Sequence, residues 1–381
     1  MKRFSGLLLL LVMMLTVGLA QVQAQDNPLL LVMDGALYQW SSGNSAVTPY
    51  ANCTPSERIV SDIALSSTGR IAFTTEPETV TDMVQQFGGF GGPLPTNIQV
   101  CNGANLTTLA SQPDNFSYFD ADVPNVAVAR SMPTWSPNGN AIAWTSFDFV
   151  TGALTLDTYN VQGDGQLNST PLVLPDFVGE IAPPFITWSD DGVIYLFHTT
   201  LDPETFAFME FVFLYDGLGN QMFQTQLPPT DESRFVYDKF IIEDAGQEWV
   251  GLLYNDNVWE LVDPATGDVQ VSDGVGELYN PSGNSDISLL LTLDENQNYV
   301  WTAKNDAGVI VDINGNNVAV PGVFPTSIEL SSNGTWVFQL FDGLYYWSMT
   351  ASGYIEGTEA VTTGFSALAW SNAQWRIYHG E

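Results

Sequence analysis

The sequence predicts an all-β protein, a single β-propeller of seven four-stranded blades with six or eight as alternatives. Three observations lead to this prediction. A turn motif between apolar strands returns along the chain, as in PTWSPNGNAIAW (133–144), ITWSDDGVIYLF (186–197) and IELSSNGTWVFQLF (328–341). A second hairpin follows each copy. Helical periodicity is nearly absent, because short runs of β-branched and aromatic residues alternate with Asn, Asp, Gly and Pro clusters.

The first 24 residues are expected to be a secretory signal peptide. Lys2 and Arg3 form a basic start, an apolar run covers 7–20, and Val22 and Ala24 are the small residues that precede a cleavage site. The apolar run is shorter than the roughly 20 residues of a membrane span, which disfavours an uncleaved anchor. We therefore expect residues 25–381 to form the propeller of a secreted, periplasmic or cell-surface protein, with no membrane span after signal removal.

The turn of the repeated motif can be followed by its glycine. Six glycines mark six copies, and a seventh copy at 368–380 has Asn372 and Ala373 at the turn: the glycines are Gly69, Gly139, Gly192, Gly246, Gly283 and Gly334. The second hairpins that follow lie at 97–110, 211–226, 256–271 and 298–316. A period of tens of residues built from four strands is typical of propeller blades.

The two ends of the domain are expected to complete one blade together. Residues 34–40, DGALYQW, resemble the second-half segment DGLYYW at 342–347, but no first half precedes them. Residues 367–379 are a first half without a second half. We therefore predict that 29–50 and 367–379 form a shared closing blade, which would hide the sheet edges at both chain ends.

The repeated motif resembles the W-S-P-D-G-x-x-I-A-F core of TolB-type, WD40-like (PD40) propeller repeats. Asn138 stands where that pattern has Asp, and Asp190 where it has Pro; both are turn-forming residues. The resemblance covers nearly all of the chain after the signal and implies the fold, not a function. It concerns the propeller part alone. The extra α/β domain of TolB has no counterpart, and residues 364–368 lack the second glycine of the Gly-x-Ser-x-Gly elbow found in hydrolase domains of the prolyl oligopeptidase family.

Charge and cysteine content restrict the partners. With 9 Lys and Arg against 43 Asp and Glu, the formal net charge is −34, which repels nucleic acid and anionic lipid. Cys53 and Cys101 are the only cysteines. In an exported chain a pair is most simply a disulfide, with two separate buried thiols as the alternative. Two Cys and two His argue against a Cys/His zinc site.

Two segments supply weak candidate sites. The segment 76–96 interrupts the first blade and carries Phe87, Phe90 and Leu94, which we interpret as a partner contact; the alternative is a flap folded over that blade. Asp120 and Asp122 could hold Ca²⁺ or act as a glycosidase pair, although a solvated loop explains them more simply.

Other residues have simpler explanations. The two imidazoles, His198 and His379, are expected to be non-catalytic strand-edge surface residues. The repeated tryptophans are expected to pack between blades, although any of them at a strand end could instead stack on a sugar; these are Trp135, Trp144, Trp188, Trp336, Trp370 and Trp375.

The sequence thus favours an exported, non-catalytic propeller, without catalytic residues or an obligatory cofactor, that binds a protein, peptide or glycan at one rim. The first alternative is a carbohydrate-active hydrolase or lyase with carboxylates at the propeller face. The second alternative is a purely structural protein of the cell envelope.

Overall fold

The computed structural model describes most of residues 28–379. The residues outside the description are 1–27, 42, 62, 78–95, 113–127, 150, 163–164, 176–182, 190, 202–207, 229–235, 245–246, 255–258, 273–275, 280–286, 294–298, 306–326, 331–335, 341–342, 348–351, 359–367, 370–375 and 380–381. The described residues contain 30 strands and no helix, and therefore no helix long and apolar enough to cross a membrane.

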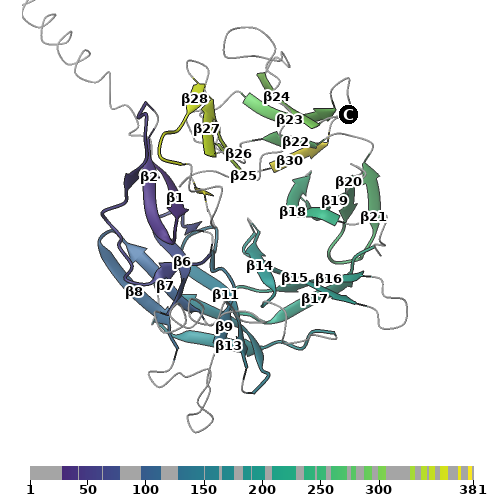
Figure 1. Ribbon diagram of the computed structural model, residues 1–381. Helices are drawn as coiled ribbons and strands as arrows, with labels where there is room; N and C mark the ends of the chain where they lie inside the picture. Colours follow the sequence, from purple (N-terminus) through teal and green to yellow (C-terminus); the bar gives the residue numbers. More distant parts are fainter. Residues whose placement is uncertain are drawn as a thin grey trace, which may run out of the picture.

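The strands form seven antiparallel sheets, numbered here 1 to 7, which follow one another around a ring (Figure 1). Sheet 1 has the order β4-β6-β7-β8, with β5 also paired to β6; sheet 2 has the order β10-β11-β12-β13, with β9 also paired to β11. The strands of sheet 1 are β4 (Arg58–Ile59), β5 (Ala64–Leu65), β6 (Ile71–Glu76), β7 (Asn97–Asn102) and β8 (Asn105–Ala110). Those of sheet 2 are β9 (Val128–Arg130), β10 (Thr134–Trp135), β11 (Ala141–Asp148), β12 (Leu154–Asn160) and β13 (Leu167–Pro171).

Sheets 3 and 4 are four-stranded meanders in chain order. Sheet 3 comprises β14 (Phe185–Trp188), β15 (Ile194–Leu201), β16 (Phe208–Tyr215) and β17 (Gln221–Gln226). Sheet 4 comprises β18 (Val236–Asp244), β19 (Gln247–Tyr254), β20 (Trp259–Val262) and β21 (Val269–Ser272).

The remaining sheets contain the segments that close the ring. Sheet 5 has the order β24-β23-β22-β30, sheet 6 the order β25-β26-β27-β28, and sheet 7 the order β29-β1-β2-β3. Sheet 5 is made of β22 (Gly276–Tyr279), β23 (Ile287–Leu293), β24 (Tyr299–Asn305) and β30 (Arg376–His379). Sheet 6 is made of β25 (Ser327–Leu330), β26 (Trp336–Leu340), β27 (Gly343–Trp347) and β28 (Ser352–Tyr354). Sheet 7 is made of β1 (Leu29–Met33), β2 (Ala36–Trp40), β3 (Thr48–Pro49) and β29 (Leu368–Ala369).

This ring of antiparallel sheets is an all-β propeller, as the sequence predicts. The number of blades stays a prediction, because sheet 5 takes its fourth strand from a distant part of the chain.

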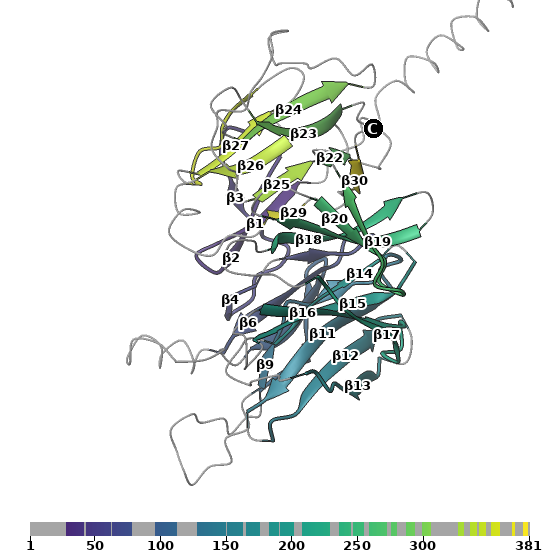
Figure 2. The ribbon, with the colours of Figure 1, turned by 90° about the vertical axis from the view of Figure 1, so that its right-hand side faces the viewer.

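The closing segment 367–379 divides between two sheets. β29 pairs with β1, with Leu30 opposite Ala369 and Leu31 opposite Leu368. β30 instead pairs with β22 in sheet 5, and Figure 2 shows the two strands beside different neighbours. The expected hairpin within one blade therefore differs from the structure. In this position β30 covers the edge of β22 that does not pair with β23.

The core lies between neighbouring sheets. Sheets 7 and 1 enclose a cluster that includes Val32, Ile59 and Phe73, and sheets 1 and 2 enclose one around the buried Trp135 and Trp144. Trp188 packs against the cluster between sheets 2 and 3. These three tryptophans have the inter-sheet packing role expected from the sequence. The side chains of Trp336, Trp370 and Trp375 lie outside the description.

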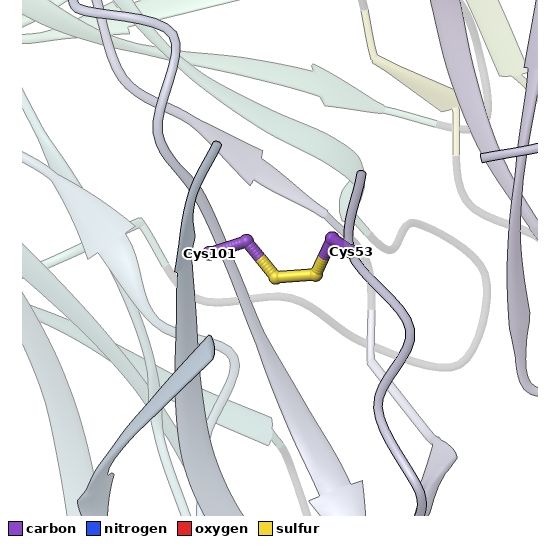
Figure 3. The surroundings of a disulfide bond; sticks show 2 residues. All are labelled: Cys53 and Cys101. Carbon is purple, nitrogen blue, oxygen red and sulfur yellow. A yellow bond between two sulfur atoms is a disulfide. The ribbon is translucent and has the colours of Figure 1, made fainter. Parts of the chain in front are cut away.

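A disulfide joins Cys53 to Cys101, as the sequence predicts (Figure 3). The two Cα atoms are 6.0 Å apart and the residues are separated by 48 positions in sequence. Cys101 lies in β7, and Cys53 precedes β4. Both are buried in the cluster between sheets 7 and 1, so the bond ties the segment that leaves sheet 7 to the third strand of sheet 1.

The connections between strands differ at the two ends of the sheets. At one end, here called the turn end, short turns such as 66–70, 136–140, 189–193 and 216–220 join the strands. At the other, called the connection end, strands are joined by longer segments such as 77–96, 111–127 and 172–184. Gly69, Gly139 and Gly192 have φ angles of 79°, 67° and 80°, the left-handed conformation that tight turns demand.

Candidate functional site

The candidate site residues named from the sequence lie outside the described residues. This applies to Phe87, Phe90 and Leu94 of the 76–96 segment and to Asp120 and Asp122. Within the described residues, no group of three or more His, Cys, Asp or Glu side chains is placed to hold a metal ion. The partner contact and the Ca²⁺ site therefore stay predictions.

His198 differs from the surface position expected for it. Its side chain is buried, a ring nitrogen (Nε2) lies 2.7 Å from the carbonyl oxygen of Pro175, and the ring stacks on Phe211 with the centroids 6.4 Å apart. The residue lies on β15, opposite Phe211 of β16, where the sheet face turns toward sheet 2. This imidazole therefore joins sheet 3 to the segment that arrives from sheet 2.

A cleft of about 490 Å³ opens between sheets 2 and 3 at the turn end. Asn138, Asn160 and Asp191 are exposed, whereas Asn140 and Trp188 are half-buried. The described lining consists mainly of polar uncharged residues: Ser136, Pro137, Asn138, Asn140, Ala141, Asn160, Trp188, Asp191, Gly192 and Gly217.

One wall of the cleft is the turn between β10 and β11. The Ser136 hydroxyl donates to Oδ1 of Asn138 (2.9 Å) and accepts from the backbone N–H of Ala141 (2.9 Å). The same Oδ1 accepts from the N–H of Asn140 (2.9 Å). These bonds fix the turn and occupy the carbonyl oxygen of the Asn138 amide, so its Nδ2 group is the part that a ligand can use.

The opposite wall is built around Trp188, the last residue of β14. Its indole Nε1 donates to the carbonyl oxygen of Thr134 across the sheet interface (3.1 Å). Trp135 makes the same bond one sheet earlier, to Ala64 (3.0 Å). The repeated bond holds the indole in one orientation, so the aromatic wall is formed before any ligand arrives.

A third turn lies against the indole. A Cβ placed on Gly217 would be 3.6 Å from Cζ3 of Trp188, so the backbone approaches the ring closely. Asp216 holds this turn: Oδ1 accepts from the N–H groups of Leu218 (2.9 Å) and Asn220 (2.8 Å), and Oδ2 accepts from Nδ2 of Asn220 (2.8 Å). These hydrogen bonds, with that of Asn220 foremost, keep the pKa of Asp216 below its ordinary value.

The cleft interrupts a contact that the preceding pair of sheets makes. Between sheets 1 and 2, the Arg70 guanidinium donates to the carbonyl oxygen of Gly139 (3.2 Å), and a Cβ on Gly139 would be 3.0 Å from the Ser67 hydroxyl. Arg70 directly follows its turn glycine, and Asn140 directly follows Gly139. At the corresponding position between sheets 2 and 3, the shorter Asn140 lines an open cleft.

A second polar cluster is buried between sheets 1 and 2, toward the connection end. Ser146 donates to one oxygen of Asp157 and Thr155 to the other (3.1 Å). Arg130 donates to the carbonyl oxygens of Thr96 and, at 3.2 Å, Ser111. Burial lowers the pKa of Arg130 to about 10, against the opposing effect of Asp157.

The side chain of Gln112 adds further hydrogen bonds beside this cluster. Gln112 donates to the carbonyl oxygens of Thr96 (2.8 Å) and Val128 (2.7 Å) and accepts from the N–H of Val128 (2.9 Å). Because these side chains mostly bond one another or the backbone, the cluster holds the two sheets together where the longer connections begin.

The described lining of the cleft combines hydrogen-bonding groups with an aromatic surface. Asp191 is the one carboxylate among the described lining residues, whereas glycoside hydrolysis commonly uses two. The amides and the Ser136 hydroxyl both donate and accept hydrogen bonds, and Trp188 adds an apolar surface with a fixed position.

From the sequence, Trp188 is one of several tryptophans that could stack on a sugar at a strand end, whereas the other cleft residues are expected only as parts of the structural repeat. The residue after the turn glycine varies along the repeat, with Asn140, Val193 and Gln247 at the places that correspond to Arg70, so this position does not mark the cleft in the sequence.

No protein-family model matches the chain, and no curated protein is similar to it in sequence. The chain is similar to the β-propeller domain of the Trilobed protease from Pyrococcus furiosus, described as having an open velcro topology, with a TM-score of 0.45 and 10% identity over 78% of this chain and 83% of that chain. An acylaminoacyl peptidase gives a TM-score of 0.46 and 11% identity, over 77% of this chain and 46% of that chain. Prolyl oligopeptidase B from Galerina marginata gives 0.43 and 11%, over 96% and 55%.

The chain thus spans about half the length of the last two proteins. At these identities the similarities concern the propeller fold alone. The resemblance to TolB-type repeats continues to rest on the repeated motif.

Proposed function

We propose that the protein is an exported, non-catalytic β-propeller that binds a protein, peptide or glycan at the turn end. The observation that carries the proposal is the cleft between sheets 2 and 3, which places a fixed indole beside several amides. Concave sites with a few well-placed polar groups and an aromatic wall are typical of ligand binding.

The charge of the chain supports the choice of partner. A net charge of −34 disfavours nucleic acid, anionic lipid and other polyanions. Three further points belong to the same proposal. Export rests on residues 1–24. The number of seven blades and membership of the TolB-type repeat family rest on the repeated motif.

The experiment is a binding screen with residues 25–381 against soluble glycans, extended peptides and candidate protein partners from the same cell envelope. Hits are measured by titration calorimetry with Asn138→Ala and with the matched control Asn102→Ala, which changes an exposed asparagine at the turn between β7 and β8 of sheet 1. We expect Asn138→Ala to weaken binding about tenfold, the effect of losing one well-formed hydrogen bond, and Asn102→Ala to leave it unchanged.

The same screen tests the alternatives. Release of shortened glycans during incubation would contradict the non-catalytic assignment and favour a carbohydrate-active enzyme. The absence of any ligand whose affinity depends on Asn138 would overturn the assignment of the binding site to the turn end.

A further inference from the structure

We infer that the cleft between sheets 2 and 3 binds a neutral sugar residue of a glycan, with the sugar ring against Trp188 and its hydroxyls bonded to Asn138, Asn140 and Asn160. This inference rests on the proposed binding function of the turn end and names the ligand class of that site. It follows from the residues that line the cleft, from their charge and from the shape of the surrounding backbone.

The lining matches a ligand that has both an apolar face and many hydroxyls. Oδ1 of Asn138 and of Asn160 already accepts backbone N–H bonds, so these amides offer mainly their Nδ2 donors to the hydroxyls of a sugar, and the Asp191 carboxylate accepts hydroxyl hydrogens. The indole of Trp188 supplies an apolar surface for the C–H face of a pyranose ring, while its N–H is already engaged by Thr134. A sugar combines such a C–H face with many hydroxyls, which matches an indole beside hydrogen-bonding groups.

The charges of the cleft exclude the most common anionic ligands. No Lys or Arg is among the described lining residues, and the chain carries a net charge of −34. A phosphate, sulfate or uronic acid would therefore meet one carboxylate and no cation. The class of sugar that fits is neutral.

The surrounding backbone disfavours an extended peptide. The cleft is formed by the three turns 136–140, 189–193 and 216–220, and the exposed strand edges of the sheets lie elsewhere, at β13 and β17. A peptide gains much of its affinity from pairing with a strand edge, which these turns do not offer. The volume of about 490 Å³ falls within the range of roughly 300–1,000 Å³ usual for small-ligand sites.

Comparison with the neighbouring sheets suggests two variants that test sugar binding in the cleft. Asn140→Arg places at this interface the residue type that follows the turn glycine of sheet 1, where Arg70 bridges to the next turn. We expect it to fill the cleft and abolish sugar binding while the protein stays folded. Trp188→Phe removes the indole from the cleft, and its matched control, Trp135→Phe, removes the same inter-sheet N–H bond in a buried position.

The probes are neutral oligosaccharides of four to six residues from the gluco-, manno-, xylo- and N-acetylglucosamine series, with glucosamine and galacturonic acid oligomers as cationic and anionic arms. Titration calorimetry and tryptophan fluorescence are measured with residues 25–381. We expect at least one neutral series to bind at one site per chain, with affinity lost in Asn140→Arg, reduced about tenfold or more in Trp188→Phe, and unchanged in Trp135→Phe.

Three results would overturn the inference. Binding of a neutral oligosaccharide that persists in Asn140→Arg would place the sugar elsewhere. Binding of the cationic or anionic arm alone would give the wrong class of sugar. If no oligosaccharide binds but a peptide or protein does so in a manner abolished by Asn140→Arg, the sugar assignment fails while the proposed binding function of the turn end stands.

Discussion

Removing the disulfide between Cys53 and Cys101 should lower the free energy of unfolding by about 4 kcal/mol. The bond joins residues 48 positions apart. In the chain-entropy description, freeing a loop of this length restores to the unfolded chain an entropy worth about 4 kcal/mol at 25 °C. The two half-cystines are 3% and 1% exposed in the cluster between sheets 7 and 1, so replacing them also removes packing.

The assay is equilibrium urea unfolding of residues 25–381, followed by tryptophan fluorescence, for the wild type and the Cys53→Ala/Cys101→Ala double variant, each with and without a thiol reductant. Reduction should cost the wild type about 4 kcal/mol and leave the double variant unchanged. The difference between the reduced wild type and the double variant then measures the lost packing. A reduction cost below about 1 kcal/mol, the size of an ordinary surface change, would refute the reasoning that the crosslink acts on the unfolded chain.

Four further predictions concern the rest of the molecule. Asp216→Ala should weaken sugar binding severalfold by loosening the turn against the indole. Because folding lowers the pKa of Asp216, its stabilisation is present above the ordinary carboxyl pKa and is lost as the pH falls through the lowered value, so the melting temperatures of variant and wild type should converge in acid, below the ordinary carboxyl pKa. Asp157→Ala should cost about 1–3 kcal/mol in urea unfolding, because the hydroxyls of Ser146 and Thr155 would lose their acceptor in a buried place; a cost below about 0.5 kcal/mol would contradict this account. Deleting 368–379 should turn a monomer into aggregates in size-exclusion chromatography, since two sheets lose a strand, whereas a monomer melting near the wild type would argue against these pairings. Replacing 80–94 by a short Gly-Ser turn should change stability by no more than about 1 kcal/mol and leave oligosaccharide affinity intact, because this segment joins β6 to β7 at the connection end; loss of a protein partner in the same variant would support the contact predicted there.

Much of the fold follows from local chemistry. Turn glycines such as Gly69, Gly139 and Gly192 need positive φ angles, and the apolar residues around them alternate or run as strands do, so the sheets can be found one by one. The disulfide follows from counting cysteines in a chain that is expected to be exported. The inter-sheet role of Trp135 follows from its place within a repeated strand.

The partner of β30 and the position of the cleft could not be predicted in the same way. A four-residue strand carries no mark that selects β22 rather than β29 as its neighbour, because strand pairing depends on which edge remains open. The cleft depends on the length of one side chain relative to its counterpart in the preceding sheet, and that comparison acquires meaning only when the turns are known to face each other. Burial of His198 likewise depends on the segment that ends at Pro175.

Because Leu30 pairs with Ala369, near the other end of the chain, we expect the ring to close late in folding. Contacts between such distant residues form slowly, because a long stretch of chain must be ordered before they gain anything. Until then β1, the uncharged segment LLLVM, presents an open edge of the kind that adds to other strands. In a cell that makes this protein, folding of each molecule therefore competes with association between incompletely folded molecules. The outcome will depend on how much unfinished protein accumulates at one time, so expression level and temperature should govern the yield of folded propeller more strongly than its final stability does.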